Sequence, residues 1–192
     1  MKNLLIVIGI LVIIFGMGSC SYNSMVKLDQ NCKSKWGAVE SQYQRRADLI
    51  PNLVATVKGV ANFEQSTLVQ VTDARARATS ITVDPSKLTP DAIQKYQAAQ
   101  GQLSTALGRL LVASENYPEL KANENFSALQ AQLEGTENRI NFARDDFNTA
   151  VQDYNSKILS FPSNLIAGIG GFTPKGYFQA EAGSDKAPTV KF

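Results

Sequence analysis

The chain has 192 residues, which is room for one domain of ordinary size and a short additional segment. Its net charge of +2, from 19 basic and 17 acidic residues, lacks the positive excess that is typical of nucleic-acid-binding proteins. Histidine is absent, which removes the commonest general base and metal ligand and every nucleophile that histidine activates. We therefore expect no catalytic residues, no metal site, no cofactor and no nucleic-acid partner.

The N-terminus has the composition of a membrane anchor. Residues 4–17 read LLIVIGILVIIFGM, and no charged residue occurs between Lys2 and Lys27. This uncharged stretch reaches the roughly 20 residues that a helix needs to cross a bilayer. We predict an anchor over residues 1–21, and a single-pass transmembrane helix is the first interpretation of it.

Two other interpretations of the anchor stay open. Residues 17–20, MGSC, resemble a lipobox in which Cys20 would be acylated, although Met17 stands where leucine is usual. A cleaved secretory signal is the third interpretation, but no A-x-A-like site follows the apolar run. Cys32 is expected to be a small apolar core residue, because two cysteines form neither a disulfide framework nor a zinc site.

Charges near the anchor do not settle its orientation. Lys2 and the α-amino group precede the segment, whereas Lys27, Lys33 and Lys35 follow it, so the positive-inside rule is nearly balanced. A lipobox favours an extracytoplasmic domain and the charge count favours the opposite side slightly. We expect a location at the bacterial cell membrane and prefer the extracytoplasmic side for the domain.

Apolar spacing predicts helices along almost the whole remaining chain. The first soluble helix is expected over about 22–47, and the next begins after a break at residues 48–51. In that break Asp48 would cap the second helix and Pro51 would lie in its first turn. The second helix should end near Thr79, before a proline-containing connection over residues 80–90.

The third and fourth helices complete the predicted fold. The third begins at Thr89 or Pro90 and ends at Tyr117–Pro118. The fourth carries a large apolar residue at every seventh position: Phe126, Leu133, Ile140, Phe147, Tyr154 and Phe161. This repeat indicates the core of a left-handed bundle. We predict an all-α fold, an antiparallel up-and-down four-helix bundle over residues 22–178, with a disordered tail over 179–192.

Two clusters are candidate functional sites. The apolar residues Leu165, Ile166, Ile169 and Phe172 follow the fourth helix, which should return toward the membrane. They would either close the end of the bundle or make a second contact with lipid or a membrane partner. The polar cluster is expected to form a membrane-distal turn, or a guanidinium fork for a carboxylate or phosphate of a partner; it comprises Arg45, Arg46, Asp48, Pro51 and Asn52.

Several strings in this chain resemble the LemA family. They include YQRRADLIPNL at 43–53, YPELKAN at 117–123 and YNSKILSFPSNLIA at 154–167. The resemblance covers nearly the whole chain, although Cys20-Ser21 before Tyr22-Asn23 departs from many members. It implies a bacterial membrane protein with one N-terminal helix and an antiparallel four-helix bundle, and no established enzymatic chemistry.

The sequence supports two functional hypotheses. In the first, the chain is a membrane-anchored, non-enzymatic scaffold or adaptor that recruits or regulates another membrane or envelope protein. In the second, it is a structural envelope protein that self-associates as a homo-oligomer. Membrane lipid is the expected partner of the N-terminal segment, and the protein partner is unidentified.

Overall fold

The computed structural model describes residues 2–60 and 63–180, and for most residues up to 17 it describes the backbone alone. Every regular element in this part of the chain is a helix, so the prediction of an all-α fold is confirmed. The helices are α1 (Lys2–Lys58), α2 (Gln65–Ser80), α3 (Pro90–Ser114), α4 (Pro118–Lys121), α5 (Glu124–Leu159) and α6 (Ser163–Gly170).

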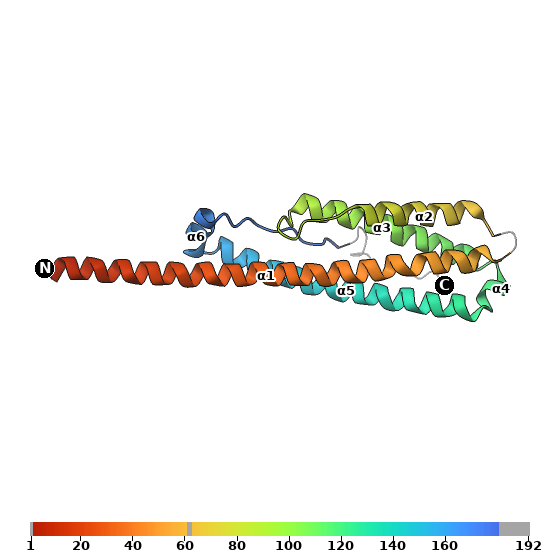
Figure 1. The fold of residues 1–192 in the computed structure, drawn as a ribbon, viewed down its shortest axis with the longest axis horizontal. Helices are drawn as coiled ribbons and strands as arrows, with labels where there is room; N and C mark the ends of the chain where they lie inside the picture. Colours follow the sequence, from red (N-terminus) through yellow and green to blue (C-terminus); the bar gives the residue numbers. More distant parts are fainter. Residues whose placement is uncertain (1, 61–62, 181–192) are drawn as a thin grey trace, which may run out of the picture.

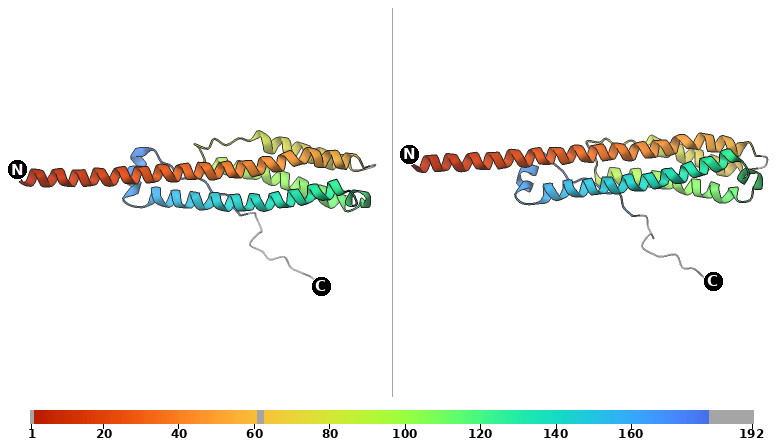
Figure 2. Two further views of the ribbon diagram at one scale, coloured as in Figure 1. Left: turned by 60° about the horizontal axis from the view of Figure 1, so that its bottom comes forward. Right: turned by 90° about the horizontal axis from the view of Figure 1, so that it is seen from below.

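Four long helices, α1, α2, α3 and α5, run alternately up and down and form an elongated bundle (Figure 1). Helix α1 packs along α5, and α2 packs along α3, while the N-terminal part of α1 extends beyond the other helices (Figure 2). The short helix α6 follows α5 and lies beside α1 where this extension begins. The predicted return of the fourth helix toward the N-terminal end is therefore present.

The predicted break at residues 48–51 was wrong. Helix α1 continues through Pro51 as one element of 57 residues and ends only at Lys58. Asp48 accordingly caps no helix; it accepts a hydrogen bond from the side chain of Gln44, one turn earlier, at 2.7 Å. The chain instead turns between Lys58 and Gln65, where α2 begins.

The predicted transmembrane helix finds no support in the described part of the chain, where no helix is both long and apolar enough to cross a membrane. Most side chains of the apolar run at 4–17 lie outside what the structure describes. The predicted disordered tail at 179–192 also lies almost wholly outside it, since 181–192 are not described. Gln179 is described, and both its backbone N–H and its carbonyl bond to Gln97.

The ends of α3 and α5 follow from their capping residues. Thr89 accepts from the Ala92 N–H at 3.3 Å and Pro90 opens α3, as the sequence predicts. Asn123 accepts from the backbone N–H groups of Asn125 and Phe126 and so caps α5.

The seven-residue repeat on α5 forms the core as predicted, except at its last member. From Phe126 to Tyr154 the repeated residues are buried, but Phe161 is 81% exposed. Helix α5 ends at Leu159, two residues before Phe161, so the last position of the repeat lies outside the helix and does not share its core face.

The core divides into two clusters along the bundle. The cluster nearer α6 surrounds Trp36 and contains the buried Cys32, so the expectation for that cysteine is confirmed. The cluster at the opposite end joins α1, α2, α3 and the start of α5 around Leu53, Leu103 and Phe126. After α6 the chain runs back along the bundle without regular structure and inserts Phe178 into the cluster around Trp36.

Candidate functional site

Helix α6 and the residues just after it pack against the N-terminal part of α1. The hydroxyl oxygens of Ser21 and Ser163 lie 3.0 Å apart within hydrogen-bonding distance. The rings of Tyr22 and Phe172 meet edge to face, with centroids 5.4 Å apart. The apolar segment after α5 therefore lies beside the helix that carries the N-terminal apolar run.

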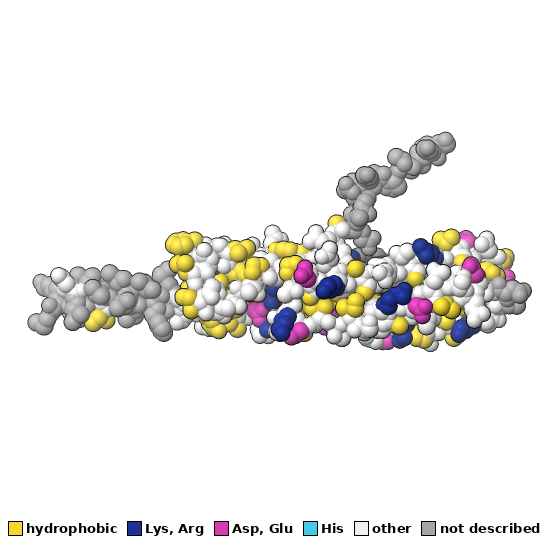
Figure 3. Space-filling model, turned by 90° about the horizontal axis from the view of Figure 1, so that it is seen from above, with side chains coloured by type: hydrophobic (Ala, Val, Ile, Leu, Met, Phe, Trp, Pro, Cys, Tyr) yellow, Lys and Arg dark blue, Asp and Glu magenta, His cyan; other side chains and the backbone are white. Residues whose placement is uncertain are grey.

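The four residues predicted to form this apolar segment face two directions. Ile166 and Phe172 pack against the core, so they close the end of the bundle. Leu165 and Ile169 point outward and are 61% and 91% exposed. Together with the exposed Phe161, these outward residues form what we call the apolar end. Figure 3 shows apolar side chains gathered at this end, while the charged side chains of the visible face lie farther along the bundle, among other apolar and polar ones.

A groove of about 720 Å³ lies between α1 and α6 at the apolar end. Cys20 is exposed and lines it, opposite the apolar side chains of α6. Lipidation of Cys20 stays a prediction. Its test is the intact mass of the wild-type protein, which would lose residues 1–19 and gain acyl mass that a Cys20→Ser variant lacks.

The predicted pair of arginines does not form a fork. Neighbouring residues on a helix point about 100° apart, and Arg45 is exposed whereas Arg46 is 2% exposed. The Nη2 of Arg46 donates to the side-chain oxygen of Gln100 at 2.8 Å and to its carbonyl at 3.2 Å. The Nη1 donates to Ser104 at 2.8 Å and to Glu137 at 3.0 Å.

Arg46 thus joins α1 to both α3 and α5 inside the bundle. Pro51 and Asn52 are exposed on α1, about one turn or more beyond this network. The structure therefore separates the predicted cluster into a buried structural arginine and a set of exposed helix residues. Binding of a partner by the exposed members stays a prediction.

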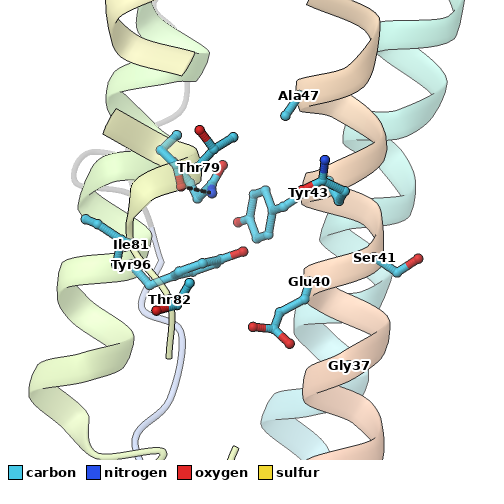
Figure 4. Close-up of a pocket in the computed structure, with 12 residues that line it drawn as sticks. Gly37, Glu40, Ser41, Tyr43, Ala47, Thr79, Ile81, Thr82 and Tyr96 are labelled. Atoms are coloured by element: carbon cyan, nitrogen blue, oxygen red, sulfur yellow. Dashed lines mark hydrogen bonds between the residues drawn. The ribbon is translucent and has the colours of Figure 1, made fainter. Parts of the chain in front are cut away.

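A cleft of about 340 Å³ opens between α1 and the α2–α3 pair (Figure 4). The rings of Tyr43 and Tyr96 point toward each other across it, with centroids 5.4 Å apart. Glu40 lines the same cleft, and burial raises the pKa of its carboxyl above the ordinary value. Within residues 2–60 and 63–180, no group of three or more Cys, Asp or Glu side chains is placed to hold a metal ion.

Sequence reasoning missed a buried ion pair. Asp29 on α1 accepts from Lys175 at 2.8 Å, and Lys175 is 7% exposed with its ammonium over the ring of Tyr154. It also missed Asn148 and Asn155, which bond to the backbone of the C-terminal segment. Each directly follows a core position of the seven-residue repeat, Phe147 or Tyr154, and this position alone does not show what the amide bonds.

Comparison with known proteins finds a family model and several relatives that match most of the chain. The family model described as "LemA family" matches residues 35–192. Magnetosome protein MamQ 1 and MamQ 2 of Paramagnetospirillum magneticum are each 28% identical to the chain over 185 residues, covering 85% of it and 66% of the relative. Protein LemA of Metamycoplasma hominis is 24% identical over 145 residues, covering 76% of the chain and 63% of the relative.

An elongated all-helical bundle with an apolar end thus coincides with a family match over most of the chain. The chain belongs to the LemA family. It spans just under two thirds of the length of the curated relatives it matches.

Proposed function

We propose that the protein is a membrane-attached, non-enzymatic scaffold whose bundle recruits or regulates another membrane or envelope protein. The observation that carries this proposal is the pairing of two uncharged segments at one end of the molecule. Residues 3–26 and 158–174 contain no Asp, Glu, Lys or Arg, and they meet where Ser21 contacts Ser163. Apart from Lys2, every charged residue of the chain lies at or after Lys27, outside these segments.

The geometry of this end fits the surface of a bilayer. From Leu4 to Ser21, α1 is about 25 Å long at 1.5 Å per residue, close to the roughly 30 Å of the hydrocarbon core. With that stretch in the membrane, α6 would lie at one interface with Leu165 and Ile169 toward the lipid. The exposed Lys27 and the half-buried Lys157 would follow at the level of the headgroups.

The bundle would then project from the membrane and carry the recognition surface. Helix α5 has 36 residues, so it extends about 50 Å from the apolar end. Most of its exposed side chains are polar or charged, although Phe142 and Leu159 are exposed too. Ion pairs such as Lys35–Asp146, at 2.6 Å, join α1 and α5.

Co-purification from detergent-solubilised membranes tests the scaffold. We expect the tagged full chain to retain one protein in a fixed ratio. The same protein should be lost when surface charges of α5 are reversed, as in Arg139→Glu with Asp145→Lys. Recovery of lipid and of copies of the chain alone would contradict the scaffold and favour the self-associating alternative.

A further inference from the structure

The C-terminal segment, residues 173–179, lies along the bundle like a bound peptide. Asn155 on α5 accepts from the backbone N–H of Lys175 at 2.9 Å and donates to its carbonyl at 2.9 Å. Asn148, two turns earlier on the same helix, does the same for Phe178, at 2.9 Å for the N–H and 3.0 Å for the carbonyl. Each side-chain amide thus bonds one residue of the segment in both directions, as a neighbouring β-strand would.

A third amide repeats this arrangement from another helix. Gln97 on α3 accepts from the backbone N–H of Gln179 at 2.9 Å and donates to its carbonyl at 2.8 Å. Arg144 on α5 donates to the same carbonyl at 2.9 Å. Backbone groups of the segment are therefore held by polar side chains from two helices, independently of the segment's own side chains.

Two side chains of the segment fill specific sites. The ammonium of Lys175 is buried between the carboxylate of Asp29, at 2.8 Å, and the ring of Tyr154, at 4.8 Å from its centroid. The ring of Phe178 stacks on Trp36, with centroids 5.9 Å apart, and meets Phe147 edge to face at 5.6 Å. One site thus selects a cation and the other an aromatic ring three residues later.

Gly176, between these two sites, adds a steric requirement. Its N–H donates to the carbonyl of Leu88 at 2.9 Å. A Cβ built at this position would lie 2.6 Å from the Cα of Pro90, which is backbone and cannot move aside cheaply. The groove between α1, α3 and α5 therefore recognises an extended peptide with the pattern Lys-Gly-x-Phe. Backbone bonds combined with side-chain pockets are the usual design of a peptide-recognition site.

We propose that this groove is a peptide-binding site that is filled here by the chain's own segment, and that the same segment of a second copy is its alternative occupant. Every contact described above can form equally well with a segment from another copy. The choice between the two states then depends on the connection to α6 and on the local concentration of copies. At that connection Gly171 has φ of 72°, a conformation that few residues other than glycine adopt.

The second copy is favoured over an unrelated peptide because its sequence supplies the whole pattern. Asp29 is complementary to Lys175 and Trp36 to Phe178, and the backbone of Pro90 leaves room only for glycine at position 176. The three amides hold the backbone of the segment, so the selectivity comes from these three positions together. The inference does not require the proposed membrane attachment or the scaffold role. Its test is performed in detergent, so its failure is distinguishable from theirs.

A peptide with the sequence of residues 173–180 provides the first test, using the full chain in detergent. Trp36 is the only tryptophan, so its fluorescence reports whether an aromatic ring occupies the Phe178 site. We expect the peptide to bind a Phe178→Ala chain saturably and at least tenfold more tightly than the wild type, whose own segment competes. A peptide with alanine at the position of Phe178 should not change the fluorescence. Phe178→Leu, a milder change, serves if the alanine variant does not fold.

Exchange between copies is tested with two differently tagged variants of the full chain. One has a defective groove (Asn148→Leu with Asn155→Leu) and an intact segment; the other has a defective segment (Lys175→Ala with Phe178→Leu) and an intact groove. We expect the two to associate with each other more strongly than the segment-defective variant associates with itself. Asn138→Leu, an exposed asparagine on the same helix, is the control for the groove variant.

Three results would overturn the proposal. The first is that the peptide fails to bind a folded Phe178 variant. In the second, the alanine-containing peptide binds as well as the native one. The third is equal association of the segment-defective variant with itself and with its complement, because copies would then associate through another surface.

Discussion

The side chain of Arg75 on α2 donates from Nε to the backbone carbonyl of Ala47 on α1 at 2.8 Å. Ala47 lies four residues before Pro51, so its carbonyl is the one that would accept the N–H of residue 51 in a regular helix. Proline has no N–H to donate to this carbonyl. Ala47 is only 3% exposed, so water cannot easily act as the donor instead. Arg75 supplies the missing donor, which explains how α1 continues through a proline.

This relationship predicts that Arg75 and Pro51 are energetically coupled. Arg75→Leu should lower the free energy of unfolding by about 1–3 kcal/mol, because it leaves a buried carbonyl unsatisfied. In a Pro51→Ala background the helix provides its own donor, so the same change should cost much less. Chemical denaturation of the four proteins of this double-mutant cycle measures the coupling.

Arg77→Leu is the matched control for this cycle, since Arg77 is an exposed arginine on the same helix. It should change the free energy of unfolding by no more than about 0.5 kcal/mol in either background. If Arg75→Leu costs the same with proline and with alanine at position 51, the Arg75–Ala47 bond does not compensate for the proline.

The bond between Arg75 and Ala47 also illustrates which features of this fold cannot be predicted from the sequence. The seven-residue repeat of α5 is visible locally, because spacing within one helix decides which residues face the core. The continuation of α1 through Pro51 is not, because its cause is a donor 24 residues later on another helix. The amides Asn148 and Asn155 were equally hidden, since a polar residue beside a core position usually faces solvent. Only the packing of residues 173–179 against α5 reveals what they bond.

Substitution of Arg46 should lower the stability of the protein strongly, whereas substitution of its neighbour Arg45 should hardly change it. Arg46→Met removes a buried guanidinium and leaves both oxygens of Gln100 without this donor, so we expect a loss of about 3 kcal/mol. The ion pair with Glu137 adds little, because that carboxylate side chain is 44% exposed. Arg45→Met should change stability by less than about 0.5 kcal/mol. Thermal and chemical denaturation compare the two, and equal losses would contradict the assigned network.

Asp29 should make the stability of the protein depend on pH in the acidic range. Burial by itself raises the pKa of its carboxyl, but hydrogen bonds and attraction from Lys175 and Lys33 outweigh it and hold the pKa below 3.8. Because the folded pKa is lower than the unfolded one, the contribution is complete well above pH 3.8 and is lost as the pH falls through the folded value.

Unfolding of the wild type and of Asp29→Asn, measured between pH 7 and pH 2.5, tests this dependence. We expect the variant to be less stable at pH 7 and the difference to shrink below pH 4. Asp84→Asn is a comparison rather than a blank: hydrogen bonds from Ser86 lower the pKa of that fully exposed loop carboxylate as well, so its contribution should have the same pH dependence without burial against a lysine. A difference between wild type and Asp29→Asn that is constant with pH would show that the Asp29–Lys175 pair does not depend on the charge of the carboxylate.

The apolar end predicts a depth in the bilayer that a fluorescent label can measure. Ile169 is 91% exposed on α6, next to the N-terminal run, whereas Val112 is 71% exposed near the opposite end of the bundle. Each is replaced by cysteine in a Cys20→Ser background, where the remaining Cys32 is buried. With the chain reconstituted in vesicles, an environment-sensitive label at 169 should emit at shorter wavelength and be quenched by a lipid-borne quencher. The label at 112 should behave as it does in water. If both labels report water, α6 does not contact lipid, because an apolar side chain at the interface is stabilised only by leaving water.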